Sequence, residues 1–273
     1  MTTPAPRVAA IQMRPISGDI AGNLDKIDMW VRAAAAIGVD MAILPENAVT
    51  GYFIADQLPD LAEAADGPSA KRLASLASEC NLHLVAGTAL AEGGNVYDAQ
   101  LMFGPDGGLI ATYRKAHLFS VERDWYAAGD APMVVETALG RIGMTICYDL
   151  MFPEYIRRLT ELGADIVINS TNWISDSFQH DVWGWSGESV LALARTRALE
   201  NGVWLAMANC TGPEAGFTSL GQSCVVAPSG KVLAAAGNGE GIAHAEIQYQ
   251  SDDLDRWRSI ATYRQDRRLD LYR

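Results

Sequence analysis

The two halves of the chain have the same order of predicted elements: a strand, a helix, a strand, a helix, a strand and a β-hairpin. Short apolar runs that stop at turn residues predict the strands, and apolar residues at three- and four-residue spacing predict the helices. In the first half, the strands are expected at 7–13, 39–47 and 82–90, the helices at 23–38 and 67–81, and the hairpin at 96–115. In the second half, the strands are expected at 141–147, 164–172 and 203–209, the helices at 153–162 and 189–202, and the hairpin at 221–237. Two such copies predict two similar sheets.

Local signals agree with this assignment. Leu24, Ile27 and Val31 fall on one face of the first helix, and Gly38 follows its end. Pro68 stands near the first turn of the second helix, where a missing N–H group does no harm. The two hairpins have matching turn signals, Pro-Asp-Gly at 105–107 and Pro-Ser-Gly at 228–230. The second half is therefore predicted to repeat the fold of the first.

The strands that precede helices are continuously apolar, which indicates that both of their faces are covered. Two sheets packed on each other, each with helices on its outer face, form a four-layer α-β-β-α sandwich with an internal pseudo-twofold repeat. A doubly wound sheet with three layers is the alternative, but the paired hairpins favour the sandwich. No stretch rich in Pro, Gly or Ser separates two zones of different composition, so we expect one domain over residues 1–273.

Composition and charge disfavour several classes of protein. The net charge of −12 disfavours binding to nucleic acid. No apolar run reaches the roughly 18 residues of a membrane span, and the first residues lack the pattern of a secretory signal. The four cysteines show neither CxxC nor Cys/His ligand spacing, which argues against a disulfide framework or a metal site. We therefore expect a cytoplasmic protein without metal or cofactor.

Three ionisable residues stand at or just beyond the ends of predicted elements. Glu46 follows "AILP", Lys115 closes the first hairpin, and Cys147 ends "RIGMTI". Sites in open α/β folds form at the carboxyl ends of strands, so these side chains are expected to meet. There a thiol near a helix N-terminus is expected to have a lowered pKa, a carboxylate can take its proton, and an ammonium group can stabilise an oxyanion.

Each of these residues also has a structural interpretation. A free cysteine is most often a small core residue, as we expect for Cys80, Cys210 and Cys224. A glutamate after proline is most often a solvated turn residue, and a lysine that closes a hairpin often protects a sheet edge. A Cys/His pair with His117 or His180 is the rival mechanism. The spacing of the residues alone leaves these alternatives open.

Three segments, "LPENAVTGY", "YRKAHLF" and "ICYDLMFPE", resemble the signature segments of the nitrilase superfamily, the carbon–nitrogen hydrolases. They occur in the family's order and at its approximate spacing, and the resemblance runs from "RVAAIQM" to the terminal "RQDRRLDLYR". The resemblance implies a four-layer α-β-β-α fold. It also implies that Glu46 is the general base, Lys115 the oxyanion-stabilising group and Cys147 the nucleophile.

Further residues take roles from the same resemblance. Glu122, shortly after the lysine segment, fits the place of the family's second glutamate, which would orient Lys115 or the substrate nitrogen. The backbone N–H of Tyr148 would be the second oxyanion donor. Tyr52, Asn172 and Trp173 are expected to line the substrate pocket.

The residues after the nucleophile separate the branches of the family. Nitrilases usually have Trp-Glu after the cysteine, whereas this chain has Tyr148 and Asp149. The segment is similar to that of the amidase branches, which act on small aliphatic or ω-amino amides and on ω-amido acids. Nitrilase and N-carbamoyl amine hydrolase activities are the alternatives. Leu150 and Met151 are apolar, which argues against a substrate carboxylate at that spot.

Other functions and partners follow from this site. A small-molecule amide is the expected substrate, and acyl transfer to an amine is a less favoured use of the same residues. A non-catalytic binding protein is a third class, which the presence of all three signature residues disfavours. The aromatic-rich segment 173–185 is interpreted as a pocket wall, an oligomer contact or a loop that packs on itself. A homodimer or higher homo-oligomer is expected from the resemblance.

Overall fold

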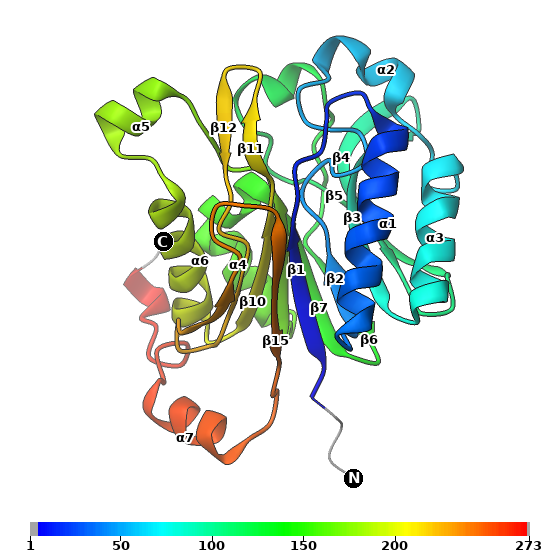
Figure 1. Ribbon diagram of the computed structural model, residues 1–273. Coiled ribbons are helices and arrows are strands. Elements are labelled where there is room, and N and C mark those ends of the chain that lie inside the picture. Colours follow the sequence, from blue (N-terminus) through cyan, green and yellow to red (C-terminus); the bar gives the residue numbers. More distant parts are fainter. Residues whose placement is uncertain (1–4, 272–273) are drawn as a thin grey trace.

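Two six-stranded β-sheets pack face to face in the computed structural model, which describes residues 5–271 (Figure 1). Residues 1–4 and 272–273, which belong to the predicted domain and in part to the family resemblance, lie outside the described residues. The first sheet has the order β15-β1-β2-β3-β4-β5, with β1 (Arg7–Gln12), β2 (Met41–Ile43), β3 (His83–Glu92), β4 (Asn95–Phe103), β5 (Leu109–Arg114) and β15 (Gly241–Glu246). The second has the order β14-β13-β10-β8-β7-β6, with β6 (Met133–Thr137), β7 (Gly140–Ile146), β8 (Ile166–Thr171), β10 (Trp204–Asn209), β13 (Cys224–Val226) and β14 (Val232–Ala235).

The topology confirms the internal repeat. In the first sheet β1, β2 and β3 are parallel and the hairpin β4–β5 continues the sheet beside β3. In the second sheet β7, β8 and β10 are parallel and the hairpin β13–β14 continues it beside β10. One antiparallel strand completes the opposite edge of each sheet, β15 beside β1 and β6 beside β7. The two halves therefore build sheets with the same plan.

Helices cover the outer face of each sheet (Figure 1). They are α1 (Ile20–Ala36) and α3 (Pro68–Cys80) on the first sheet, and α4 (Pro153–Glu161) and α6 (Gly187–Asn201) on the second. Leu24, Ile27 and Val31 of α1 are buried in the core outside the first sheet. Between the sheets, Ile43 and Ile168 belong to one core, and each such buried aliphatic side chain contributes roughly 1.5–3 kcal/mol. The four-layer sandwich is confirmed, and the alternative of one doubly wound sheet is wrong.

Two element boundaries differ from the sequence-based prediction for a visible reason. Helix α1 begins at Ile20 rather than at residue 23, because the side chain of Asp19 accepts a hydrogen bond from Gly22 N at 3.0 Å and caps it. Strand β2 has only three residues, so Glu46 lies in the turn beyond the strand. Both ends of α3 agree with the prediction: Pro68 is in its first turn, and Asn81 after it is left-handed with φ of 51°.

Several elements were missed because they lack a continuous apolar run. The edge strands β6 and β15 are half-exposed, so their sequences show no strong pattern. A small sheet forms from β9 (Ile174–Ser175), β11 (Thr211–Glu214) and β12 (Phe217–Leu220). The short helices are α2 (Leu58–Leu61), α5 (Ser177–Trp183), α7 (Asp252–Ile260) and the 3-10 turns η1 (Ala55–Gln57), η2 (Ser120–Asp124), η3 (Cys147–Met151) and η4 (Leu269–Leu271). The β11–β12 hairpin, α2 and α5 lie at the end toward which β1 points (Figure 1).

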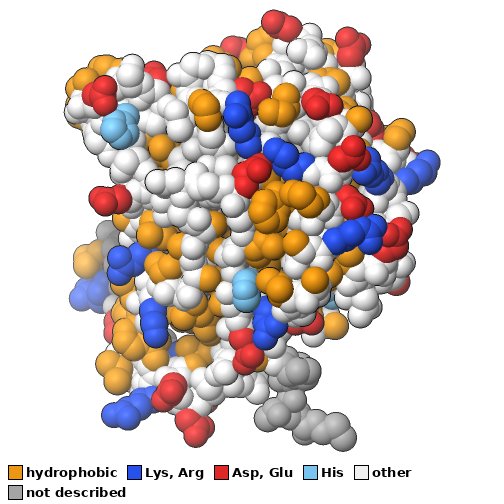
Figure 2. Space-filling model, in the orientation of Figure 1, with side chains coloured by type: hydrophobic (Ala, Val, Ile, Leu, Met, Phe, Trp, Pro, Cys, Tyr) orange, Lys and Arg blue, Asp and Glu red, His pale blue; other side chains and the backbone are white. Residues whose placement is uncertain are grey.

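Basic and acidic side chains are interspersed on the face of the molecule shown in Figure 2, in a chain whose net charge is −12. Within residues 5–271, none of the helices combines the length and the apolar character that a membrane span requires.

Candidate active site

Glu46, Lys115 and Cys147 lie at the ends of three strands and form one buried cluster. Glu46 follows β2, Lys115 follows β5 and Cys147 follows β7. The side chains of Glu46 and Lys115 are fully buried, and Cys147 is 5% exposed. The charge of Glu46 raises the pKa of the Cys147 thiol and the charge of Lys115 lowers it, which indicates that the three groups are neighbours. The structure thus brings together the three residues that the sequence analysis singled out at the ends of predicted elements.

The ammonium group of Lys115 donates hydrogen bonds to three carboxylates. Its Nζ lies 2.5 Å from Glu46 Oε1, 2.8 Å from Glu122 Oε1 and 3.1 Å from Asp98 Oδ2. Three acceptors match the three protons of an ammonium group. Burial acts to lower the pKa of Lys115, but attraction to Glu46, Asp98 and Glu122 raises it well above its ordinary value. Lys115 is therefore a permanent cation at the centre of the cluster.

Glu122 lies in η2 and is held by neutral donors as well as by Lys115. Its Oε1 accepts from the hydroxyl of Tyr52 at 2.6 Å, and its Oε2 accepts from Phe119 N at 2.7 Å. Burial raises the pKa of Glu122, and the nearby Lys115 acts against that shift. Burial raises the pKa of Tyr52 well above its ordinary value, and the charge of Glu122 raises it further. The hydroxyl therefore keeps its proton and remains a donor. Glu122 therefore anchors Lys115, and Tyr52, expected in the substrate pocket, contacts Glu122 directly.

Asp98 is a member of the cluster that the sequence analysis missed. It lies on β4, it is fully buried, and its backbone oxygen also accepts from Lys115 N at 2.8 Å. The available signal was a charged residue inside the otherwise apolar and neutral strand "NVYDAQLMF". A search confined to strand ends does not reach it, because Asp98 is in the interior of its strand.

Three carboxylates that approach one another this closely raise the question of a metal ion. One oxygen each of Glu46, Asp98 and Glu122 lies within 4.8 Å of the others. The Nζ atom of Lys115, however, is within hydrogen-bonding distance of all three. The ammonium group thus takes the place of a metal cation in this cluster.

Cys147 sits at a sharp turn between β7 and η3. Its φ of 42° is in the left-handed region, which is unusual for a non-glycine residue and typical of a nucleophile on a strand-to-helix turn. Burial, followed by the charge of Glu46, raises the pKa of Cys147 well above its ordinary value, although Lys115 and a hydrogen bond with Thr171 act to lower it. The expected lowering of this pKa is therefore wrong. The buried thiol is protonated in the free protein, so it needs a base.

Asp149 supports this turn and was not assigned a role from the sequence. Its Oδ2 accepts from Ile146 N at 2.9 Å and from the hydroxyl of Tyr113 at 2.6 Å. Its Oδ1 accepts from His117 N at 2.9 Å and lies 2.8 Å from His117 Nδ1. Asp149 therefore ties the turn that carries Cys147 to the loop that follows Lys115.

The two histidines of the rival mechanism, His117 and His180, make contacts with residues other than Cys147. The ring of His117 stacks on Phe152 with centroids 3.9 Å apart, and its Nδ1 lies beside Asp149. His180 lies in α5, where Nδ1 is 2.8 Å from Asp181 Oδ1 and both side chains are exposed. These contacts favour the Cys/Glu/Lys arrangement over the rival Cys/His pair.

The predicted pocket residues beyond β8 differ in their contacts with the cluster. Asn172 N donates to Glu46 Oε2 at 2.8 Å, and Asn172 Oδ1 accepts from the hydroxyl of Ser219 at 2.6 Å. Trp173 N donates to Asn209 Oδ1 at 3.0 Å, and the residue is only 7% exposed. Asn172 thus orients Glu46 through its backbone, whereas Trp173 is part of the core beside the site.

Tyr148 is the second residue of η3, so its backbone N–H belongs to a first turn, where intrahelical acceptors are lacking. Its ring meets Phe119 and Phe152 edge-on, with centroids 5.2 Å and 5.1 Å away. The side chain therefore packs against the loop after Lys115, while the backbone stays beside Cys147.

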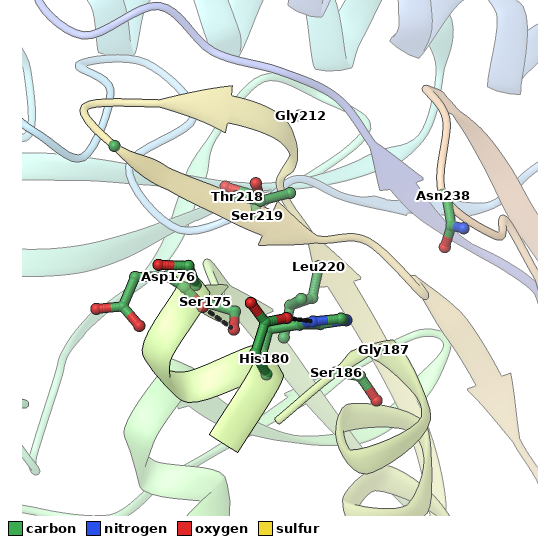
Figure 3. A pocket seen from close by; sticks show the side chains of 13 residues that line it. Ser175, Asp176, His180, Ser186, Gly187, Gly212, Thr218, Ser219, Leu220 and Asn238 are labelled. Carbon is green, nitrogen blue, oxygen red and sulfur yellow. Dashed lines mark hydrogen bonds and ion pairs between the residues drawn. The ribbon is translucent and has the colours of Figure 1, made fainter. Parts of the chain in front are cut away.

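The aromatic-rich segment 173–185 divides into a packed and an exposed part. The rings of Trp173 and Trp185 meet edge-on at 5.8 Å. Phe178 and Trp183 of α5 are 59% and 75% exposed. A cavity of about 700 Å³ lies between α5 and the β11–β12 hairpin (Figure 3). Ser219 lines this cavity and donates to Asn172, whose backbone N–H donates to Glu46, so a chain of two hydrogen bonds connects the cavity wall to the cluster.

The fold and the site together define a class of protein: a four-layer α-β-β-α sandwich with a Glu, a Lys and a Cys buried in one cluster. The sequence model of one family, described as carbon-nitrogen hydrolase, matches residues 7–258. The chain therefore belongs to the carbon–nitrogen hydrolase family, and it is an enzyme of the amidase-like branch of the nitrilase superfamily.

Known proteins are similar over nearly the whole chain. A Pseudomonas protegens protein named hydrolase in pqqF 5'region is 36% identical, over 97% of this chain and 90% of that protein. The 2-oxoglutaramate amidase of Bacillus subtilis is 34% identical, over 97% of this chain and 98% of its own. A solved structure of the amidase from Nesterenkonia sp. AN1, with the acetamide moiety of fluoroacetamide bound covalently to its active-site cysteine, has a TM-score of 0.83 and 27% identity. It covers 99% of this chain and 96% of that one. These similarities confirm the family resemblance that was based on three segments.

Proposed function

We propose that this protein is a thiol amidohydrolase that cleaves the C–N bond of a small linear amide to an acid and ammonia through a thioester on Cys147. The observation that carries the proposal is the buried Glu46–Lys115 pair, 2.5 Å apart, beside a cysteine in a strained turn. A protonated thiol with a raised pKa needs a base, and Glu46 is the carboxylate that acts most strongly on it.

The reaction follows from these groups. Glu46 takes the proton of Cys147, and the sulfur forms a bond to the carbonyl carbon. The N–H groups of Lys115 and the backbone N–H of Tyr148 stabilise the oxyanion. Glu46 gives the proton to the leaving nitrogen, the C–N bond breaks, and ammonia departs. Water, deprotonated by Glu46, then attacks the thioester; the acid leaves and Cys147 regains its proton.

Glu122 has a supporting role in this scheme. It contacts Lys115 with both oxygens near 2.8 Å and is itself fixed by Tyr52. When one N–H of Lys115 turns to the oxyanion, Glu122 keeps the ammonium group in position. Tyr52 and Asn172 also line a cavity of about 10 Å³ with Ser219, which has room for about one water molecule and is too small for an acyl group. Contact of Tyr52 and Asn172 with the substrate therefore stays a prediction.

The amide is favoured over other C–N substrates because relatives named as amidases match nearly the whole chain. The Bacillus relative is named for an ω-amido acid, so ω-amido acids belong in the substrate panel together with aliphatic, ω-amino and aryl-aliphatic amides. Nitrile hydrolysis, N-carbamoyl amine hydrolysis and acyl transfer remain the alternatives with the same site. The homo-oligomer likewise stays a prediction.

The test is a Cys147→Ser variant assayed for ammonia release over amides, nitriles and carbamoyl compounds. We expect a loss of more than about 1,000-fold on the best amide. Cys80→Ser is the matched control, because Cys80 ends α3 and is free and partly exposed. Full activity of Cys147→Ser would contradict the proposal.

A covalent probe gives a second readout. The sulfur of Cys147 can displace fluoride from fluoroacetamide, forming a C–S bond as the C–F bond breaks. We expect one acetamide adduct by mass spectrometry, mapped to Cys147 and absent in Cys147→Ser. An adduct confined to another cysteine contradicts the mechanism.

A further inference from the structure

The three carboxylates around Lys115 differ in how many donors reach them. Glu122 accepts from an ammonium, a hydroxyl and a backbone N–H group. Glu46 accepts from Lys115 and from a backbone N–H group. Asp98 accepts only the longest of the Lys115 contacts, at 3.1 Å, and its Oδ1 has no hydrogen-bond partner among the described residues. Asp98 is therefore the carboxylate that its surroundings stabilise least as an anion.

The net charge of the cluster also favours a neutral Asp98. If Glu46, Asp98 and Glu122 were all ionised, three negative charges would face the single positive charge of Lys115 in a buried site. A buried charge without compensation costs several kcal/mol, so a proton is expected on one of the carboxyls. That proton belongs on the carboxyl with the fewest donors, which is Asp98.

The groups that face Asp98 come from four segments. They are Glu46 after β2, Lys115 after β5, Glu122 in η2 and Tyr126 just beyond it. Burial raises the pKa of Asp98 well above its ordinary value, and the Glu46 carboxyl, which has an oxygen within 4.8 Å of one of Asp98, acts in the same direction through this contact, while Lys115 acts against it. A proton on Asp98 gives this shared contact a donor.

We propose that Asp98 is a positioning residue for Glu46: it keeps a proton, donates a hydrogen bond to the Glu46 carboxylate and accepts one from Lys115. The proposal rests on the proposed function, since it concerns the orientation and the basicity of Glu46. Asp98 holds the same proton throughout the cycle, while Glu46 alone receives the thiol proton and passes it to the leaving nitrogen.

The neutral state of Asp98 matters for the two anions of the reaction. A negative charge on Asp98 repels both the attacking sulfur and the developing oxyanion, which Lys115 must stabilise. With Asp98 neutral, the cluster keeps one excess negative charge instead of two. Activity is therefore expected to fall as the pH rises and Asp98 loses its proton.

Two substitutions at Asp98 test the role. Asp98→Ala removes both hydrogen bonds and is expected to lower kcat about 100-fold. Asp98→Asn keeps a neutral donor for Glu46 and an acceptor for Lys115, so it is expected to regain at least about tenfold over Asp98→Ala. The fall of kcat on the alkaline side is expected to move to higher pH in Asp98→Asn. An Asp98→Asn variant as impaired as Asp98→Ala overturns the proposal, because it means that the charge of Asp98 is needed.

Infrared spectroscopy reads the proton directly and needs no turnover. The wild type is expected to show a C=O band of a protonated carboxyl that is lost in Asp98→Asn. Asp149→Asn is the matched control: Asp149 is equally buried but accepts from backbone and side-chain donors on both oxygens, so the band should persist. A wild-type spectrum without this band contradicts the proposal.

The two proposals fail in different ways. If Cys147→Ser stays active, the proposed function fails whatever the infrared result. If Cys147→Ser is inactive and Asp98→Asn shows no lost band, only the role of Asp98 fails.

Discussion

The two sheets have the same plan, but the polar clusters beside their hairpins differ in charge. In the first half, the β4–β5 hairpin contributes Asp98 and Lys115 to a charged cluster. In the second half, the β13–β14 hairpin is flanked by Ser223 and Gly237, which bond the side chain of Gln12. We refer to Gln12, Asn209 and Ser223 as the amide cluster. Both clusters are buried, so the comparison isolates the effect of charge.

The amide cluster is satisfied by its own neutral groups. Gln12 Nε2 donates to the oxygens of Gly237 and Gly239 at 2.9 Å and 2.6 Å, and Gln12 Oε1 accepts from Ser223 N at 2.7 Å. Asn209 N donates to the hydroxyl of Ser223 at 2.8 Å. The charged cluster, by contrast, leaves Asp98 Oδ1 without a partner. Among the described residues, hydrogen bonding is therefore incomplete in the charged cluster, where the chemistry is proposed, as is common at functional sites.

The largest effect is expected from removing the only cation of the charged cluster with Lys115→Met. The buried carboxylates then lose their counter-ion, so the free energy of unfolding should fall by about 3–5 kcal/mol at neutral pH. Activity should fall more than about 1,000-fold, because the oxyanion loses its donor. Urea unfolding and ammonia release measure the two effects.

The matched control is Lys231→Met, at the exposed lysine of the other hairpin. There the change in stability should stay within about 0.5 kcal/mol. Equal stability of the two variants would show that Lys115 is not the counter-charge.

A smaller effect is expected in the amide cluster. Gln12→Ala leaves the buried Ser223 N without its partner, whereas the oxygen of Gly237 still accepts from Gln222 N at 2.8 Å. The free energy of unfolding should fall by about 1–3 kcal/mol. Because Gln12 has no role in the proposed reaction, kcat should change less than about threefold. The exposed Gln248→Ala is the control for stability. A loss of kcat as large as that of Lys115→Met would contradict the division into a structural cluster and a chemical cluster.

The smallest effect is a gain in stability from Asp98→Asn. The pKa of Asp98 is raised in the folded protein above its ordinary 3.8, so the folded state binds more protons than the unfolded state above that pH. The stability of the wild type should then fall as the pH rises from near 3.8, whereas Asp98→Asn escapes this loss. We expect a gain of about 1 kcal/mol at neutral pH, which vanishes at low pH. Urea unfolding as a function of pH checks it, and a deficit that grows with pH would indicate that Asp98 is ionised.

The sequence predicted most of the framework and part of the site. Continuous apolar runs predicted β1, β7, β8 and β10, because a strand that is buried on both faces consists of consecutive apolar residues, which are visible in the sequence. The edge strands β6 and β15 were missed, because they are half-exposed and depend on pairing with distant residues. Glu46, Lys115 and Cys147 could be selected because strand ends converge in α/β folds. Asp98 and Asp149 could not, because their roles depend on which donors reach them.

By itself the sequence determined the two-fold order of elements, the family and the residues able to carry the chemistry, because these are properties of local pattern and side-chain type. Only the tertiary structure decided in which direction the pKa values of the cluster are shifted. The pKa of Cys147 is raised rather than lowered because burial outweighs the attraction of Lys115. One ammonium group facing three carboxylates, from segments far apart in the chain, is likewise a product of folding. The energy of a buried charge depends on its neighbours in space, and these are not neighbours in sequence.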